Sequence, residues 1–240
     1  MKIESLKGAN VALVAMGGSH LDFNYSQING YEYDEVWAIN AMLGIIEHDR
    51  VIMLDPPSRF LDTNDAGDMT KMMREKLPLH DKPIYTCELD ERVPSAVLYP
   101  VEEVANFGNS SYLNNTTAFG VAFAYYQEVS HLDIYGADFV YEETTYSGEA
   151  GRGCTEYWIG KCTEKGMIVG CGNRSSLLDT CLPITEKLYG YHRLPTTPFL
   201  RQTKDGFKLT NFDDFQREMR KNNLKNIEWN RLFEPPKAKR

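Results

Sequence analysis

The stretch that decides the fold runs from Leu113 to Tyr146 and reads LNNTTAFGVAFAYYQEVSHLDIYGADFVYEETTY. A polar loop precedes a segment that predicts a helix beginning at Thr116 or Thr117, and a short apolar strand then ends before Asp138. A helix that leads into a buried strand is half of a βαβ unit, and open α/β sheets bind ligands beyond the carboxyl ends of their strands. We therefore expect Asp138 to lie at a ligand site, an arrangement typical of enzymes.

Short apolar runs alternate with segments that predict helices or loops along most of the chain. The runs that predict strands are Asn10–Met16, Glu35–Ile39, Val51–Leu54, Ile84–Cys87, Val97–Tyr99, Leu132–Tyr135 and Met167–Gly170. Nearly continuous apolar strands indicate a sheet that is covered on both faces. The alternation predicts an α/β fold with a doubly wound, mostly parallel sheet of about six strands.

Segments between these runs predict the layers that cover the sheet. Further helices are predicted at Ala41–Glu47, Asn64–Leu77 and Thr155–Gly166. Past Leu182 the pattern fades, and a helical or irregular appendage with one charged helix over Asn211–Asn223 is expected. We therefore expect two parts, residues 1–182 and residues 183–240.

The charge of the chain restricts its partners. The formal net charge is -8 and the sequence pI is about 5.2. Binding to a nucleic-acid backbone needs a basic face, so such a partner is not expected, whereas a single nucleotide needs only a few amides and cations. No apolar run reaches the about 20 residues of a membrane-spanning helix, and the N-terminal residues lack the apolar segment of a signal peptide. A cytoplasmic protein is predicted, and its oligomeric state is left open.

Five cysteines invite a test for a zinc site: Cys87, Cys154, Cys162, Cys171 and Cys181. The chain contains no C-x-x-C pair, which is the usual spacing in structural zinc sites. The odd number fits reduced thiols in a protein without a signal peptide. No metal site is therefore predicted.

Polar or glycine residues follow four of the predicted strands. They are Gly17, Gly18, Ser19, Asn40, Asp55, Gly136 and Asp138. Glycines let a backbone approach a phosphate, an asparagine can donate to and accept from a base or ribose, and an aspartate can accept from ribose hydroxyls. Each residue alone could cap a helix or make a turn, but four such strand ends together favour a nucleotide site. The dinucleotide fingerprint G-x-G-x-x-G is absent, which argues against an NAD site.

Two tyrosines and an arginine follow Asp138. The phenols of Tyr141 and Tyr146 can donate to a phosphate oxygen, or their rings can pack on the sheet edge. Arg152 stands between two glycines in what reads as a loop, so its planar guanidinium either approaches an anion or stays solvated. Glu156 lies in the first turn of the helix predicted from Thr155, where it can act as a base or compensate the helix dipole.

The order of these motifs resembles that of the bacterial sialyltransferases of glycosyltransferase family 42. It also resembles that of the related 6-hydroxymethylpterin diphosphokinase-like proteins, some of which occur in phages. The matching segments are Met16-Gly17-Gly18-Ser19-His20-Leu21, Asn40, Asp55-Pro56, Asn115-Thr116-Thr117 and Gly136-Ala137-Asp138-Phe139. The resemblance covers Asn10 to Leu178 and implies a Rossmann-like nucleotide-binding domain over residues 1–182. It adds Asn115 and Thr116 to the nucleotide site and implies that Tyr141 and Tyr146 bind the leaving phosphate.

The chain departs from these sialyltransferases at two positions. The first turn lacks the family's proline, and the place of the catalytic histidine, which serves as the general base, is matched by Arg152. Arginine cannot be deprotonated in a protein, so Arg152 cannot be a base. With the two tyrosines, it would instead neutralise charge on a departing phosphate.

The leading hypothesis is a transferase that uses a nucleotide-activated donor, with glycosyl transfer from a nucleotide sugar as the expected reaction. Tyr141, Tyr146, Arg152 and Glu156 are then the catalytic candidates, and Glu149 or Asp138 are other candidates for the base. No cofactor is required by this reading.

Two alternatives remain from the sequence. One is a diphosphokinase-like enzyme that uses ATP and magnesium, with the ion held by Asp55 and Asp138 at neighbouring strand ends. The other is a protein that binds or sequesters a nucleotide without catalysis, which the missing histidine and proline favour.

Overall fold

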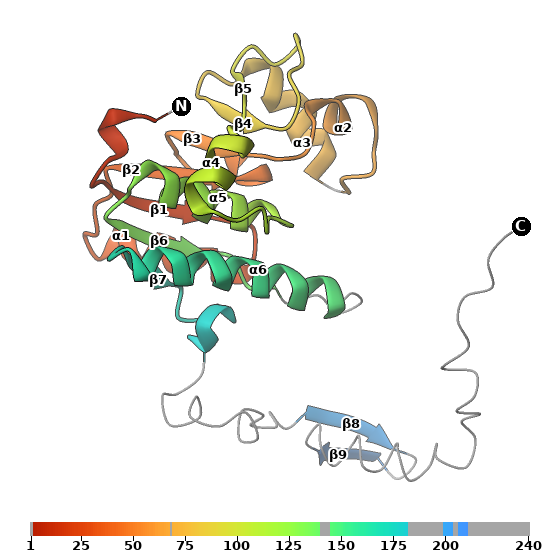
Figure 1. Ribbon diagram of the computed structural model, residues 1–240. Helices are drawn as coiled ribbons and strands as arrows, with labels where there is room; N and C mark the ends of the chain where they lie inside the picture. Colours follow the sequence, from red (N-terminus) through yellow and green to blue (C-terminus); the bar gives the residue numbers. More distant parts are fainter. Residues whose placement is uncertain (1, 68, 140–144, 182–198, 204–205, 211–240) are drawn as a thin grey trace, which may run out of the picture. The chain divides into compact units, whose positions relative to one another are not determined.

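The computed structural model describes residues 2–67, 69–139, 145–181, 199–203 and 206–210. Its centre is a seven-stranded parallel sheet with the strand order β5-β4-β3-β2-β1-β6-β7 (Figure 1). The strands are β1 Asn10–Val14, β2 Glu35–Ile39, β3 Arg50–Ile52, β4 Ile84–Thr86, β5 Ala96–Leu98, β6 His131–Tyr135 and β7 Ile168–Cys171. The α/β, Rossmann-like fold predicted from the sequence is confirmed, with seven strands instead of about six.

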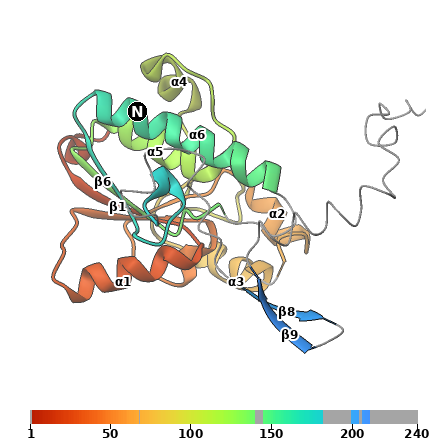
Figure 2. The same cartoon turned by 90° about the horizontal axis from the view of Figure 1, so that it is seen from below.

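Helices cover both faces of this sheet. They are α1 Leu21–Ile28, α2 Pro57–Asp62, α3 Met69–Lys76, α4 Val101–Gly108, α5 Thr116–Gln127 and α6 Thr145–Glu164. Short 3-10 helices are η1 Glu4–Leu6, η2 Gly18–His20, η3 Asn40–Gly44, η4 Leu77–Leu79 and η5 Leu177–Asp179. Figure 2 shows α4, α5 and α6 on one face and α1 and α3 on the other. Because both faces are covered, the central strand β1 is apolar and buried from Val11 to Val14.

Two apolar clusters fill the space between the sheet and its helices. On the face of α5 and α6, Trp37 packs on Phe123 with ring centroids 5.4 Å apart, and Trp158 is fully buried. On the opposite face, Phe23 of α1 and Met73 of α3 lie in the second cluster. Large buried rings contribute most of the apolar area that stabilises such a core.

The direction in which strands are added reverses at β1. The chain places β2 to β5 on one side of β1 and then crosses to place β6 and β7 on the other. β1 pairs in parallel register with β2, where Val11 lies opposite Glu35, and with β6, where Asn10 lies opposite His131. The carboxyl ends of β1 and β6 therefore flank a topological switch point, which is where open α/β sheets bind ligands.

The greatest difference from the sequence analysis concerns α6. This helix begins at Thr145, so the segment from Gly151 to Gly153, expected as a loop, is helical instead. The two glycines of this segment lower its intrinsic helix propensity, which is why the sequence favoured a loop. Burial of Cys154 and Trp158 in the core offsets that loss. Of the segment predicted as a helix at Ala41–Glu47, only Ala41–Gly44 is helical, as part of the 3-10 helix η3.

Contacts between residues divide the chain into two compact units, Met1–Leu182 and Pro183–Arg240. In the second unit, β8 Phe199–Thr203 pairs antiparallel with β9 Gly206–Thr210, a hairpin that the sequence analysis did not identify. The helix expected over Asn211–Asn223 lies outside the described residues. The assignment of a nucleotide-binding domain and an appendage to these units stays a prediction. Among the described residues, the helices are too short or too polar to cross a bilayer.

Candidate functional site

A cavity of about 590 Å³ opens at the carboxyl ends of β1, β2 and β6. Its walls come from segments that are far apart in the sequence. The polar and glycine residues that line it are Gly17, Gly18, Asn40, Asn115, Thr116, Thr117, Gly136, Asp138 and Arg174. The cavity lies at the switch point of the sheet, as expected for an α/β ligand site, and we call it the switch-point pocket.

The first wall is a glycine turn in which two strand ends almost touch. The amide of Gly17 donates to the carbonyl of Gly136 at 2.7 Å. A Cβ atom on Gly17 would lie 2.6 Å from this carbonyl, and one on Gly136, where φ is +69°, would lie 2.0 Å from the carbonyl of Ala15. Neither position accepts a side chain without a backbone shift, so these glycines are required by the close approach of β1 and β6.

Asp138 and Ser19 connect the same two strand ends through side chains. Asp138 accepts from the backbone amide of Ser19 at 2.8 Å and from the Ser19 hydroxyl. The Ser19 hydroxyl in turn accepts from the amide of Gly136 at 2.8 Å. Ser19 is fully buried and does not line the switch-point pocket. It therefore supports the glycine turn without contacting the pocket.

Asn40 lines the switch-point pocket with an unusual backbone and an unsatisfied side chain. Its φ is +50°, in the left-handed region that asparagine tolerates better than most residues. Its amide oxygen Oδ1 is buried and has no hydrogen-bond partner among the described residues. A buried acceptor without a partner costs about 1–3 kcal/mol, so a ligand that donates a hydrogen bond to Asn40 would recover this energy.

The amino end of α5 forms the opposite wall. Asn115 caps the helix, because its side-chain oxygen accepts from the amide of Ala118 at 3.0 Å. The side-chain nitrogen of Asn115 donates to the carbonyl of Gly151 at 3.0 Å, which joins α5 to α6. In the first turn, where Thr116 and Thr117 lie, an α-helix offers no acceptor for the amides, and the macrodipole is positive. This end of the pocket therefore favours an anion.

Arg174 supplies a cation that the sequence analysis did not select. It follows β7, and its Nε and Nη2 atoms donate to Asp22 Oδ1 at 3.0 and 2.7 Å. This hydrogen bonding to Asp22 raises the pKa of Arg174, so the guanidinium is charged at every physiological pH. The signal in the sequence was a cation three residues after the end of β7, the strand that neighbours β6.

Asp55 lies at the end of β3 but does not line the switch-point pocket. Its carboxylate accepts from Arg59, and its carbonyl accepts from the Thr86 hydroxyl at 2.9 Å. The expectation that Asp55 and Asp138 stand at neighbouring strand ends is wrong, because β2 and β1 lie between β3 and β6. Three strand spacings separate these strands by about 14 Å. One magnesium ion cannot bind both carboxylates directly across that distance, since its oxygen ligands lie at about 2.1 Å.

Arg152 and Glu156 belong to the middle of α6, so the expectation that Glu156 lies in a first turn is also wrong. Arg152 Nε donates to Glu156 Oε1 at 2.9 Å, and Nη2 donates to Asp179 Oδ1 at 2.7 Å. Glu156 Oε1 also accepts from the amide of Leu178 at 2.8 Å. The two side chains thus fasten η5 to α6 and do not line the switch-point pocket. Their proposed catalytic roles stay predictions that this geometry does not support.

The two tyrosines of the predicted phosphate site have different positions. Tyr141 lies outside the described residues. The backbone of Tyr146 is in the first turn of α6, and its side chain lies outside the description. The roles of both phenols stay predictions.

Among the described residues that line the switch-point pocket, Asp138 is the only carboxylate and none is a histidine. Both oxygens of Asp138 accept hydrogen bonds from Ser19. No group of three or more histidine, cysteine, aspartate or glutamate side chains in the described parts of the chain could hold a metal ion. The described lining of the pocket therefore offers no carboxylate or imidazole that is free of hydrogen bonds to the protein.

No family model and no curated protein matches the chain. Among solved structures, the sialyltransferase CstII from Campylobacter jejuni, in complex with the substrate analogue CMP-3FNeuAc, is similar in fold. The two chains are 12% identical, with a TM-score of 0.46 over 91% of this chain and 99% of that chain. A likeness at this level concerns the fold alone, so the site is argued from the residues of this chain.

Proposed function

We propose that the chain binds a nucleotide-activated donor in the switch-point pocket and transfers the activated group to an acceptor, with a nucleotide sugar as the donor. One observation carries the nucleotide part of this proposal. The pocket joins the amide oxygen of Asn40, which has no partner among the described residues and suits a base or ribose, to the amino end of α5 and Arg174, which suit phosphates.

The positive groups would act on both the bound donor and the departing group. The amides at the start of α5 and the guanidinium of Arg174 are held in place before the ligand arrives, by the Asn115 cap and by Asp22. Preorganised donors of this kind stabilise the negative charge that develops on a leaving phosphate. This supports transfer from a nucleotide more than binding of a neutral molecule.

The glycosyl part of the proposal is supported by the sequence motifs. The turn of Gly17 to Ser19, Asn40, the Asn115-Thr116-Thr117 segment and the Gly136-to-Phe139 segment follow the order found in glycosyltransferase family 42. Residues of all these segments line the switch-point pocket, although Ser19 itself does not.

A second candidate function is binding of a nucleotide without catalysis. The observation that favours it is the lack of a disengaged base among the described residues of the pocket, where Asp138 is bound to Ser19. The diphosphokinase-like alternative is disfavoured, because the separation of β3 from β6 keeps Asp55 and Asp138 from sharing a magnesium ion.

Thermal shift and calorimetric titration with CMP, UDP and ATP, each with and without magnesium, test the nucleotide site. We expect saturable binding of a nucleotide without a requirement for magnesium. Binding that requires ATP and magnesium together would instead favour the diphosphokinase-like alternative. Incubation with CMP-sugars and UDP-sugars and an acceptor panel then tests transfer, and tight binding without release of nucleotide would favour the non-catalytic candidate.

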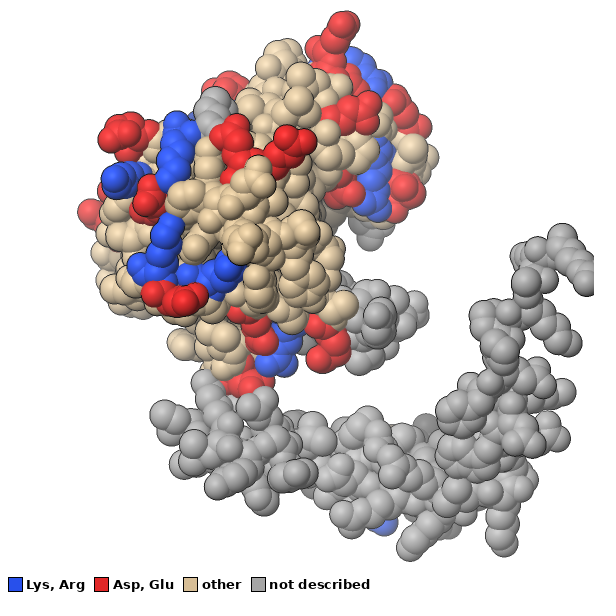
Figure 3. Space-filling view, viewed as in Figure 1, with Lys and Arg blue, Asp and Glu red and all other residues tan. Residues whose placement is uncertain are grey.

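One face of the molecule bears on the expectation that the chain does not bind a nucleic-acid backbone. Figure 3 shows acidic and basic side chains interspersed over the visible face of the described residues. A protein that follows a nucleic-acid backbone presents a basic stripe or patch. A cytoplasmic location and the oligomeric state stay predictions.

A further inference from the structure

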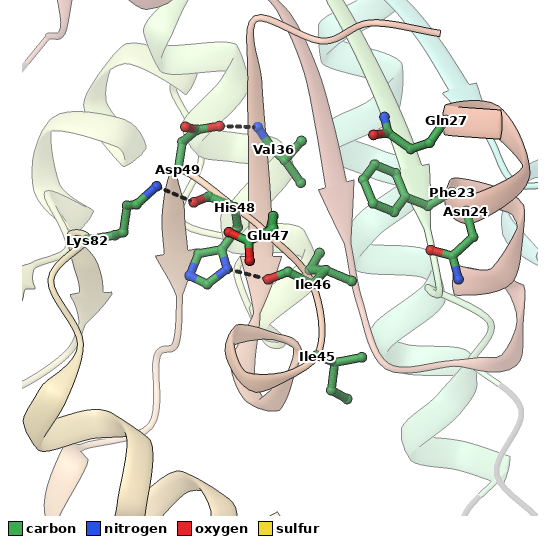
Figure 4. A pocket seen from close by; sticks show the side chains of 10 residues that line it. All are labelled: Phe23, Asn24, Gln27, Val36, Ile45, Ile46, Glu47, His48, Asp49 and Lys82. Carbon is green, nitrogen blue, oxygen red and sulfur yellow. Dashed lines mark hydrogen bonds between the residues drawn. The ribbon is translucent and has the colours of Figure 1, made fainter. Parts of the chain in front are cut away.

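Two histidines meet at the amino ends of the strands, whereas the switch-point pocket lies at the carboxyl ends. His48 directly precedes β3, and His80 lies between η4 and β4, so both are at the amino ends of their strands. Figure 4 shows His48 on the wall of a second cavity of about 440 Å³, with its ring turned towards the carbonyl of Ile46. Both imidazoles are half-buried.

Hydrogen bonds to carbonyls determine which ring nitrogens carry protons. His48 Nδ1 lies 2.8 Å from the carbonyl of Ile46, and His80 Nδ1 lies 2.8 Å from the carbonyl of Lys82. A carbonyl oxygen can only accept, so each Nδ1 is an N–H donor. In a neutral ring with a proton on Nδ1, the other nitrogen, Nε2, carries a lone pair in the ring plane.

The two Nε2 atoms face each other at 2.8 Å. The ring planes differ by only 10°, and the ring centroids are 5.1 Å apart. The centroid separation exceeds the Nε2 separation by about two ring radii, so the nitrogens point at each other nearly along the line between the rings. Two neutral rings would place two lone pairs in repulsive contact, and a cation between them removes that repulsion.

The distance between the nitrogens selects the cation. A zinc ion binds imidazole nitrogen at about 2.0–2.1 Å, so two ligands in line would stand about 4 Å apart. A hydrogen bond from a nitrogen donor spans about 2.7–3.2 Å, which includes the observed separation. We infer that His48 and His80 form a site for a single shared proton, which fastens the loop before β3 to the loop before β4 and makes the stability of this edge depend on pH.

The charges around the pair are mixed. Glu47 and Asp49 flank His48, and Asp81 and Lys82 follow His80. Asp49 accepts from the amide of Val36 at 2.9 Å, and Lys82 Nζ donates to the carbonyl of His48 at 2.9 Å. Burial, together with the charge of His48, lowers the pKa of His80, which opposes a second proton on the pair.

The sign of the pH dependence follows from the protons bound in each state. In the unfolded chain both histidines titrate near pH 6.5. Below that pH the unfolded chain binds two protons and the folded pair one, so stability falls as the pH falls. Above it the unfolded chain binds none, whereas the proton inferred to lie between the two Nε2 atoms is held by two nitrogens at once, so stability falls as the pH rises. The contribution of the pair is therefore greatest near pH 6.5.

A double-mutant cycle with His48→Gln and His80→Gln, measured by thermal unfolding from pH 5 to 8.5 both with and without EDTA, tests this inference. We expect each single variant to lower the midpoint by about 3 °C near pH 6.5. The coupling between the two substitutions should shrink towards both ends of the pH range. The full chain is used throughout.

The control is His20→Gln. His20 Nδ1 faces the carbonyl of Gly17 at 2.9 Å, but His20 has no second ring among the described residues. The decrease in thermal midpoint caused by His20→Gln should show no maximum near pH 6.5. A coupling between His48 and His80 that is zero or independent of pH would overturn the inference. A coupling that EDTA removes and zinc restores would also overturn it, because the shared cation would then be a metal ion.

Discussion

Asn40 joins a left-handed backbone to a buried amide oxygen that has no partner among the described residues. We expect Asn40→Ala to weaken nucleotide binding about tenfold, because the variant cannot accept the ligand's hydrogen bond. Alanine in a left-handed conformation costs about 1–2 kcal/mol, so the ligand-free protein should also lose some stability.

Asn109 provides the matched control for this substitution. It ends α4 with a φ of +46° and does not line the switch-point pocket. Asn109→Ala therefore carries a similar backbone cost without removing a pocket acceptor. Calorimetric titration of both variants separates the two effects, and equal affinities would rule out Asn40 as a ligand contact.

Gly17 tests the close approach of β1 and β6. A Cβ atom there would meet Gly136 O and Asp138 Oδ2 at 2.6 Å, so Gly17→Ala should lower stability by about 1–3 kcal/mol and reduce nucleotide binding. Gly160→Ala in α6 is the control, since nothing lies within 4 Å of its added Cβ. It should raise stability by about 0.5–1 kcal/mol, as expected in a helix interior, and keep binding intact. Urea unfolding and titration measure both; if Gly17→Ala matches Gly160→Ala, the turn is not constrained.

Single residues show how far the sequence predicts the site. Asn40 and Gly17 could be found because each follows an apolar strand, and strand ends meet at one edge of a parallel sheet. Ser19 was found in the same way, but its burial behind the turn depends on Asp138, more than a hundred residues later, and no local pattern shows that contact. Arg174 was missed because its position depends on which strand neighbours β6.

At the scale of elements, η5 is held on α6 by the Arg152–Glu156–Asp179 cluster. Leu178 and Asp179 both have a φ of +52°, and such strained residues persist only where their surroundings hold them. Arg152→Ala should therefore lower the thermal midpoint and weaken the binding of all nucleotides by a similar factor. The reason is that loss of the η5 contacts would displace the loop that contains Arg174.

Arg174→Ala is the matched comparison. Its guanidinium is half exposed and lines the pocket, so its loss should weaken a monophosphate about threefold and a diphosphate more strongly, because more negative charge faces it. Titrations with mono-, di- and triphosphates distinguish the two arginines. A charge-dependent loss in Arg152→Ala but not in Arg174→Ala would reverse their assigned roles.

The elements themselves were predictable to different degrees. β2 was predicted at its observed bounds, because an apolar run between polar ends is a local signal. The first half of α6 was not predictable, since its glycines disfavour a helix, and the packing of Trp158 and Cys154 against the core and the bond from Asn115 to Gly151 are not local signals.

At the scale of the whole molecule, we expect the contacts at the amino ends of the strands to affect stability without affecting nucleotide binding at the carboxyl ends. Glu35 accepts from Arg50 Nε and Nη2 and from Trp37 Nε1 at the amino edge, where its side chain is only 15% exposed. Glu35→Ala leaves a nearly buried guanidinium without its carboxylate, so it should cost about 3–5 kcal/mol. Nucleotide affinity, measured below the unfolding transition, should not change.

The control for this prediction is Asp62→Ala, which removes an exposed partner of Arg92. Surface ion pairs contribute little, so the urea midpoint should stay nearly unchanged. If Glu35→Ala loses nucleotide affinity as well as stability, the amino and carboxyl ends of the strands are energetically coupled.

The strand order also has a consequence for the synthesis of the chain. β1 is made first, yet its partner on one side, β6, is made more than a hundred residues later. Until then, a nascent chain has an apolar strand with one unpaired edge, and such edges readily pair with strands from other molecules. A ribosome that pauses before β6 would expose an aggregation-prone nascent chain, whereas a chain that has passed β7 can complete the sheet. Refolding from denaturant should be slow for the same reason, because the central pairing must first close a very large loop.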